Sequence, residues 1–144
     1  MKFIRLVCIA LVIVIVINIT QVIATPKPQN QESIKSFSQW CKQKDSLPKE
    51  TKHTVEVLLK KAAAYDCASA EQILNERQQL ILKNQISDLK PLAGLTNLTT
   101  LLLRSSKISD LSPLEGLSNL TRLELQNNPI KNKTCPVREC FFSS

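Results

Sequence analysis

A repeat with a period of 22 residues fills the C-terminal half of this chain and constrains its fold more than any other feature. When residues 84, 106 and 128 are placed in one column, the segment ISDLKPLAGLTNL from residue 86 lies over ISDLSPLEGLSNL from residue 108. Both glycines of the chain fall in a single column of this alignment. A unit this short buries its apolar side only against a neighbouring copy, so the repeats predict a stacked solenoid.

The unit has the leucine-rich-repeat spacing Leu-x-x-Leu-x-Leu-x-x-Asn-x-Ile over residues 120–130, and over 98–108 with Ser106 in the place of Asn. The alternation around Leu101 and Leu103 predicts a short strand with two leucines inward and the intervening side chains on a concave side. An Asn side chain can satisfy the backbone groups at the following bend, whereas Ser106 does so only weakly. The predicted fold class is α/β, a short solenoid of about three repeats with a parallel β-sheet on its concave face.

The first repeat departs from this pattern. Glu76 and Gln79 stand where the second repeat has leucines, while Leu80 and Leu82 lie one residue away from the expected register. We therefore expect the first strand to be shifted or bulged. The tail after the last repeat, with its sequence CPVRECFFSS, does not follow the period and leaves the closing cap of the solenoid undefined.

Outside the strands, each repeat returns along its convex side. In the second repeat a short helical or irregular stretch begins at Ser112 and Pro113 and ends at Gly116. Asp88 and Asp110 recur with the period and are interpreted as turn residues rather than as catalytic carboxylates.

Three short helices are predicted before the repeats. The apolar spacing indicates one helix over residues 33–44 with its first residue as the cap, and a second over 48–64 with Pro48 in its first turn. Asp66 and Ser69 are alternative caps of a third helix. These helices are expected to cover the open end of the solenoid, where the first repeat has no neighbour.

The first 24 residues have the layout of a secretory signal. Lys2 and Arg5 precede an unbroken apolar run from Leu6 to Ile17, and Ala24 ends a small-residue cleavage site. We expect cleavage and a secreted or periplasmic protein; the alternative is an uncleaved segment that anchors the chain in a membrane. The predicted organisation is a signal peptide over 1–24, a flexible linker over 25–32, a helical N-terminal cap over 33–76, leucine-rich repeats over 77–131 and a C-terminal cap or tail over 132–144.

Four cysteines lie outside the signal segment, an even number that favours disulfides in an exported chain. Three pairings are possible. We favour Cys41 with Cys67 and Cys135 with Cys140, since each pair lies within one segment and does not cross the repeats. A zinc site is disfavoured because paired CxxC spacing is missing and His53 is the only histidine. The sequence therefore predicts no metal and no cofactor.

The formal net charge of +7 could attract nucleic acid or an anionic surface. However, the lysines between residues 42 and 61 are not interleaved with aromatic side chains, which make up only 4% of the chain. A solvated helical face is the simpler explanation, and no nucleic-acid partner is expected.

The phrases ISDLKPLAGLTNLTTL and ISDLSPLEGLSNLTRLELQNNPI resemble those of bacterial internalin-type leucine-rich-repeat proteins, over about residues 79–130. The flanking segments SFSQWCKQKDSLPKETKHTVEVLLKKA and NKTCPV are similar to the flanks of short secreted members of that group. The resemblance implies a parallel-sheet solenoid that recognises proteins through its concave face and has no catalytic centre.

The candidate binding surface is the concave strand face. Arg104 and Arg122 could hold carboxylates there, although unpaired surface charge is the simpler interpretation. Leu102 could anchor a partner or pack against Ile81 on the next strand. The predicted partner-binding residues are Lys83, Thr100, Leu102, Arg104, Arg122, Glu124 and Gln126.

The sequence shows no nucleophile with a base, no paired carboxylates in a pocket and no metal cluster, so an enzyme is not expected. The predicted function is that of an exported, monomeric protein-protein interaction module whose partner is a protein. Contact with a membrane is expected only if the N-terminal segment is retained. The alternatives are a membrane-tethered or envelope structural protein without a specific ligand, and a shortened remnant of a longer repeat protein.

Overall fold

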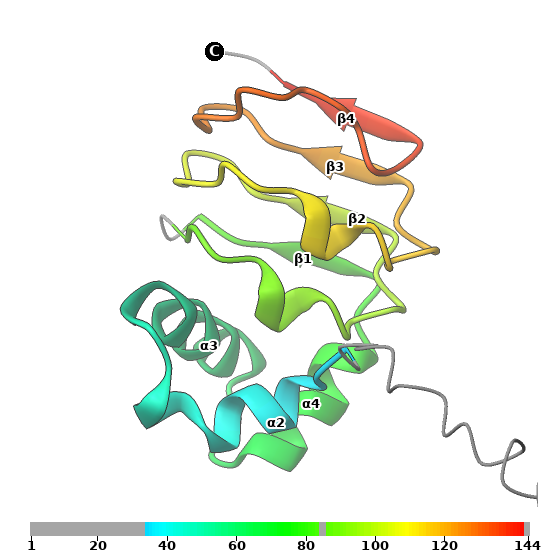
Figure 1. Cartoon of the computed structure of the whole chain (residues 1–144). Coiled ribbons are helices and arrows are strands. Elements are labelled where there is room, and N and C mark those ends of the chain that lie inside the picture. The colour runs from blue at the N-terminus through cyan, green and yellow to red at the C-terminus, as the bar shows by residue number, and fades with distance from the viewer. Residues whose placement is uncertain (1–33, 84–85, 143–144) are drawn as a thin grey trace, which may run out of the picture. The chain divides into compact units, whose positions relative to one another are not determined.

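The computed structural model describes residues 34–83 and 86–142, so the predicted signal peptide and linker lie outside the described residues. Three helices come first and a parallel sheet follows (Figure 1). The helices are α2 (Phe37–Lys42), α3 (Lys49–Ala62) and α4 (Cys67–Asn75), and the 3-10 helices are η1 (Lys44–Ser46), η2 (Lys90–Leu92) and η3 (Ser112–Leu114). The strands are β1 (Gln79–Ile81), β2 (Thr100–Leu102), β3 (Arg122–Glu124) and β4 (Glu139–Phe141).

Hydrogen bonds at its first turn place the start of α2 later than the sequence predicts. Ser36, not Ser33, is the N-cap: its Oγ accepts from the amide of Gln39, and the Gln39 side chain accepts from the amide of Ser36 at 2.8 Å. This reciprocal pair satisfies two amides that the helix itself leaves unpaired. The predicted single helix over residues 33–44 was therefore wrong at both ends, since η1 begins separately at Lys44.

The other two helices form close to where they were predicted. Pro48 is the N-cap of α3, one position before the first turn. The helix ends at Ala62, and Ala63 follows as its C-cap in the left-handed conformation. Of the two possible caps for α4, the structure uses Asp66, whose Oδ1 accepts from the amides of Ala68 and Ser69. Among the described residues, none of the helices is long and apolar enough to cross a bilayer.

The helices close the open end of the repeats through apolar packing and a polar link. Phe37, Leu58 and Leu74 are fully buried in one core with the leucines of the first repeat. The hydroxyl of Thr51 donates to the Asp88 carboxylate at 2.5 Å, and the hydroxyl of Thr54 donates to the Asp88 carbonyl at 2.8 Å. Asp88 therefore serves a turn and also docks α3, which supports its structural interpretation.

Two pairs of cysteines lie at bonding distance, and they are the pairs that the sequence favours. The Sγ atoms of Cys41 and Cys67 are 1.94 Å apart and connect α2 to α4. The Sγ atoms of Cys135 and Cys140 are 1.97 Å apart and connect β4 to the segment before it.

The sheet has the order β1-β2-β3-β4 and is parallel throughout, as predicted for a leucine-rich-repeat solenoid. Leu80, Leu101 and Leu123 are partners in its central column and are all buried. The 22-residue alignment would place Gln79 opposite Leu101, but Leu80 occupies that position. This is the one-residue shift expected from the sequence of the first repeat. In sequence, Leu82 and Ile86 are one residue closer together than Leu103 and Ile108 in the second repeat, and both Leu82 and Ile86 are buried.

The fourth strand comes from outside the repeats. In the predicted organisation residues 132–144 form only a cap or tail, but Glu139–Phe141 continues the sheet beside β3, with Cys140 opposite Leu123. The amide of Leu125 donates to the Phe141 carbonyl at 2.9 Å. The tail therefore covers the last repeat by completing the sheet, and it does so without the repeat sequence.

The Asn column works as the repeat pattern predicts. The side-chain amide of Asn128 donates to the carbonyls of Leu103 and Leu125, and its Oδ1 accepts from the amide of Ile108 at 3.2 Å. Ser106, in the preceding turn, is 5% exposed and makes a side-chain bond of 3.5 Å to the Arg104 carbonyl. The turn of the second repeat is consequently held by weaker side-chain bonds than the turn of the third.

The convex turns are short and tightly packed. The carboxylates of Asp88 and Asp110 accept from the amides of Lys90 and Ser112, each at 2.9 Å, and so begin η2 and η3. Residues 34 and 35, which precede α2, lie close to the glycines of these turns. A Cβ atom on Gly94 would lie 3.3 Å from the Lys35 carbonyl, and one on Gly116 would lie 3.4 Å from Cδ1 of Ile34.

Restoring the Asn column should stabilise the protein. We expect Ser106→Asn to raise the free energy of unfolding by about 1 kcal/mol, because the amide can bond to backbone groups that Ser reaches poorly. The reciprocal variant Asn128→Ser should lower it by about 1–3 kcal/mol. Urea unfolding followed by circular dichroism measures both. A neutral or destabilising Ser106→Asn would contradict this account of the second turn.

Candidate functional site

The candidate site is the outer sheet face, which we define by the strand side chains that alternate with the buried central column. It corresponds to the predicted concave side. The register places its residues in two cross-strand rows. The rows are Gln79, Thr100, Arg122 and Glu139, and Ile81, Leu102, Glu124 and Phe141.

A buried carboxylate lies at the centre of this face. Glu124 is only 4% exposed, although its position in the strand pattern predicts a solvent-facing side chain. Arg104 donates from Nε at 2.8 Å and from Nη2 to Oε2, and Arg122 donates from Nε at 3.1 Å and from Nη2 at 2.7 Å to Oε1. The interpretation of these arginines as unpaired surface charges was therefore wrong, because both hold the same carboxylate of their own chain.

The two guanidinium groups lower the pKa of Glu124. Hydrogen bonds from Arg122 and then from Arg104 are the main causes, and the positive charges add to them; burial acts in the opposite direction. The ionised carboxylate is thus the form that the folded protein favours. Each guanidinium side chain remains 47% exposed, so the cluster is buried at its carboxylate and open at its arginines.

The C-terminal strand contributes an aromatic ring that the sequence did not assign to the site. The guanidinium of Arg122 lies over the ring of Phe141, 4.6 Å from its centroid, in a cation-π arrangement. Phe141 is the register partner of Glu124 and is 39% exposed. The available signal was the alternation of Glu139, Cys140 and Phe141 after the Cys135 bridge, which fits a short strand but lies outside the repeat period.

Apolar side chains flank the cluster. Leu102 is half-buried and is the register partner of Ile81, which is 37% exposed. Leu102 therefore lies beside Ile81 and is also partly open to solvent. Of the other predicted residues, Lys83 is exposed, while Thr100 and Gln126 are half-buried. The Oε1 atom of Gln126 is buried and lacks a hydrogen-bond partner within the described part of the chain.

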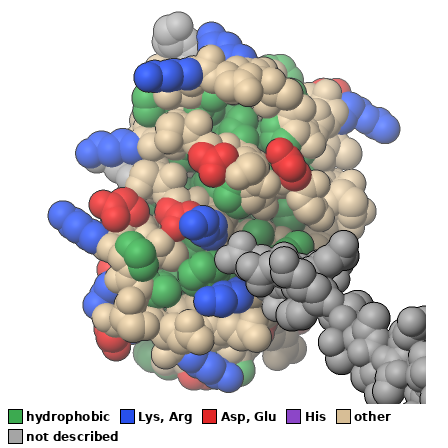
Figure 2. Space-filling view, viewed as in Figure 1, with side chains coloured by type: hydrophobic (Ala, Val, Ile, Leu, Met, Phe, Trp, Pro, Cys, Tyr) green, Lys and Arg blue, Asp and Glu red, His purple; other side chains and the backbone are tan. Residues whose placement is uncertain are grey.

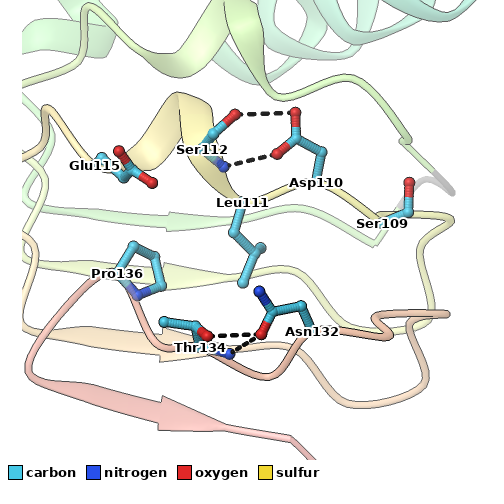
Figure 3. A pocket seen from close by; sticks show the side chains of 8 residues that line it. All are labelled: Ser109, Asp110, Leu111, Ser112, Glu115, Asn132, Thr134 and Pro136. Atoms are coloured by element: carbon cyan, nitrogen blue, oxygen red, sulfur yellow. Dashed lines mark hydrogen bonds between the residues drawn. The ribbon is translucent and has the colours of Figure 1, made fainter.

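A pocket of about 250 Å³ lies on the opposite, convex side (Figure 3). Four of its polar residues bond within their own turns: both carboxylate oxygens of Asp110 accept from Ser112, and Oδ1 of Asn132 accepts from the amide and hydroxyl of Thr134. The bonds from Ser112 also lower the pKa of Asp110. Because these four side chains already make hydrogen bonds that stabilise their turns, we interpret them as structural.

The rest of the described surface adds no chemical centre. Acidic side chains show over the middle of the repeats on the side that carries η2 and η3, and several Lys and Arg side chains project at the edges of this view (Figure 2). Residues 34–83 and 86–142 contain no group of three or more His, Cys, Asp or Glu placed to hold a metal ion. His53 is exposed on α3 in the helical cap and does not belong to the outer sheet face.

The comparisons with known proteins agree with the repeat type. Residues 96–134 match the family model described as leucine-rich repeats in two copies. Internalin C2 of Listeria monocytogenes is a similar solved structure, with 35% identity over 51% of this chain and 35% of its own, at a TM-score of 0.45. An internalin of the same species, inlF, has 24% identity over 54% of this chain and 30% of its own, at a TM-score of 0.39. No curated protein matches the sequence significantly.

The family model confirms the predicted leucine-rich repeats over residues 96–134. The chain spans about a third of the length of these internalin structures, so the likeness covers one part of them.

The cluster around Glu124 should make folding stability sensitive to acid. Because the pKa of Glu124 in the folded protein lies below its ordinary value of 4.5, the stabilisation is fully present above that value and is lost as pH falls through the folded pKa. The melting temperature of the unmodified protein should therefore fall more between about pH 6 and about pH 3 than that of Glu124→Gln. Thermal melts at several pH values measure this difference.

Glu115→Gln is the matched control, because Glu115 is exposed on the convex side and its substitution changes the net charge by the same amount. Its melting temperature should follow that of the unmodified protein. Parallel curves for all three proteins would show that ionisation of Glu124 does not contribute to the acid sensitivity of the fold.

Proposed function

We propose that this protein is a non-catalytic protein-protein interaction module that recognises its partner through the outer sheet face. The observation that carries the proposal is the cluster of Arg104, Glu124, Arg122 and Phe141. It combines positioned hydrogen-bond donors with an exposed aromatic ring, the residue types that dominate protein interfaces. Leu102 and Ile81 add apolar area beside it.

The size of the face sets the strength of such binding. Four strands about 4.8 Å apart, each contributing a few residues, give a few hundred Å², whereas a stable interface needs about 800 Å² on each partner. Binding through this face alone is therefore weak. A partner that also contacts the helical cap, or that offers several copies of its epitope, would bind more tightly.

The predicted organisation along the chain belongs to the same proposal. We propose that residues 1–24 direct export and are removed, that 25–32 link them to the cap, and that the folded unit comprises the cap over 33–76, the repeats over 77–131 and the C-terminal segment over 132–144. Two disulfides form in an oxidising compartment, so they support the proposal of a secreted or periplasmic protein.

The recognition face can be tested with a charge-changing variant on that face and a matched control elsewhere. The variant Lys83→Glu/Thr100→Glu reverses and adds charge on the outer sheet face, and Lys90→Glu/Ser118→Glu makes the same change of charge on the convex side. With the protein immobilised, we expect a partner from envelope or secreted fractions to be retained by the unmodified chain and by the convex variant, and to be lost by the face variant. Quantitative mass spectrometry of the eluates measures this.

Circular dichroism and thermal melts of each variant establish that it is folded. If a specific partner is retained equally by both variants, the outer sheet face is not the recognition surface. If every folded protein fails to retain a partner, a structural role in the cell envelope becomes the better explanation.

A further inference from the structure

The arginines of the outer sheet face are held in place before any partner arrives. Glu124 binds Arg104 through one carboxylate oxygen and Arg122 through the other. A free arginine side chain carries about 2 kcal/mol of rotamer entropy, part of which is lost whenever it is fixed in a complex. In this protein the internal carboxylate has already restricted both side chains, so a ligand need not order them.

The cluster retains positive charge and free donors. One carboxylate offsets only one of the two guanidinium groups, and it engages two of the five N–H donors that each guanidinium has. Both arginine side chains are 47% exposed, while the carboxylate side chain is 5% exposed. The surface of the cluster is therefore cationic, and its negative component lies beneath.

The surroundings select among anionic ligands. Glu139 is the register partner of Arg122 and is exposed, so a long polyanion or a densely anionic surface would meet a like charge at this edge. On the neighbouring row, Ile81, Leu102 and Phe141 present apolar surface. A single carboxylate between apolar side chains complements both features, and a peptide segment can supply that combination.

We propose that the outer sheet face binds a protein segment in which a carboxylate is flanked by apolar side chains. The carboxylate meets Arg104 and Arg122, and the apolar residues lie on Leu102 and Phe141. This inference rests on the proposed function and names the chemistry of the partner. Arg104 and Arg122 are then the specificity-determining residues, and Glu124 is a positioning residue.

The test uses the full chain labelled with ¹⁵N and a panel of short peptides with blocked ends. Each peptide contains one Glu beside Leu, Ile or Phe, and a matched copy has Gln in place of Glu. We expect the Nε–H signals of Arg104 and Arg122 to shift with the Glu peptides, and the affinity to be at least about tenfold higher for Glu than for Gln. Titrations followed by NMR measure both quantities.

The cluster is then removed as a unit, because taking away the arginines alone would leave a buried carboxylate unpaired. Arg104→Met/Arg122→Met/Glu124→Met lowers the net charge by the same amount as Lys90→Gln, which lies on η2 away from the face. We expect the preference for Glu to disappear in the first variant and to persist in the second. Melting curves show whether each variant is folded.

Equal affinity for the Glu and Gln peptides in the unmodified protein would overturn the inference without any variant. A preference that survives in the folded Met variant would overturn it as well, as would arginine signals that respond to anionic vesicles but not to the Glu peptides. If the Glu preference is missing but Lys83→Glu/Thr100→Glu still loses its partner, only this inference fails. If that variant also retains the partner, the proposed function fails with it.

Discussion

Burial of the inward leucines is the interaction on which the rest of the structure depends. Leu80, Leu101 and Leu123 stack in one column of a parallel sheet and are buried in one core with the other inward leucines. A buried leucine contributes about 1.5–3 kcal/mol relative to an exposed one, so an uncovered end would be costly. The chain covers one end with helices and the other with Cys140 of β4, and both coverings use residues outside the repeats.

The period made the solenoid predictable because it reports directly which residues stack. The two cysteine pairings followed from segment layout, and the one-residue shift of β1 followed from the displaced Leu80 and Leu82. Helix ends were less predictable: the start of α2 depends on a side-chain bond between Ser36 and Gln39, a detail that apolar spacing does not carry. Strand β4 was not predicted, because its residues do not belong to the 22-residue repeat.

The candidate site was predicted as a surface but not as a cluster. Arg122 and Glu124 belong to β3, and Arg104 bonds to Glu124 from just after β2; all three belong to the surface that the sequence predicts. The burial of Glu124 is not visible in the sequence, because it accompanies hydrogen bonds from two flexible arginine side chains. Charged residues on a strand face look alike in sequence whether they face solvent singly or satisfy one another.

The position of residues 34 and 35 beside the glycines of the convex turns affects how the repeat array unfolds. In an ordinary solenoid each unit contacts only adjacent units, so the array behaves as a one-dimensional chain that frays from either end. Here the Lys35 carbonyl lies close to Gly94, and the side chain of Ile34 reaches Gly116, so the first residues of the cap lie against two successive convex turns. We therefore expect the helices to unfold together with the first two repeats, and fraying to begin at the end that carries β3 and β4.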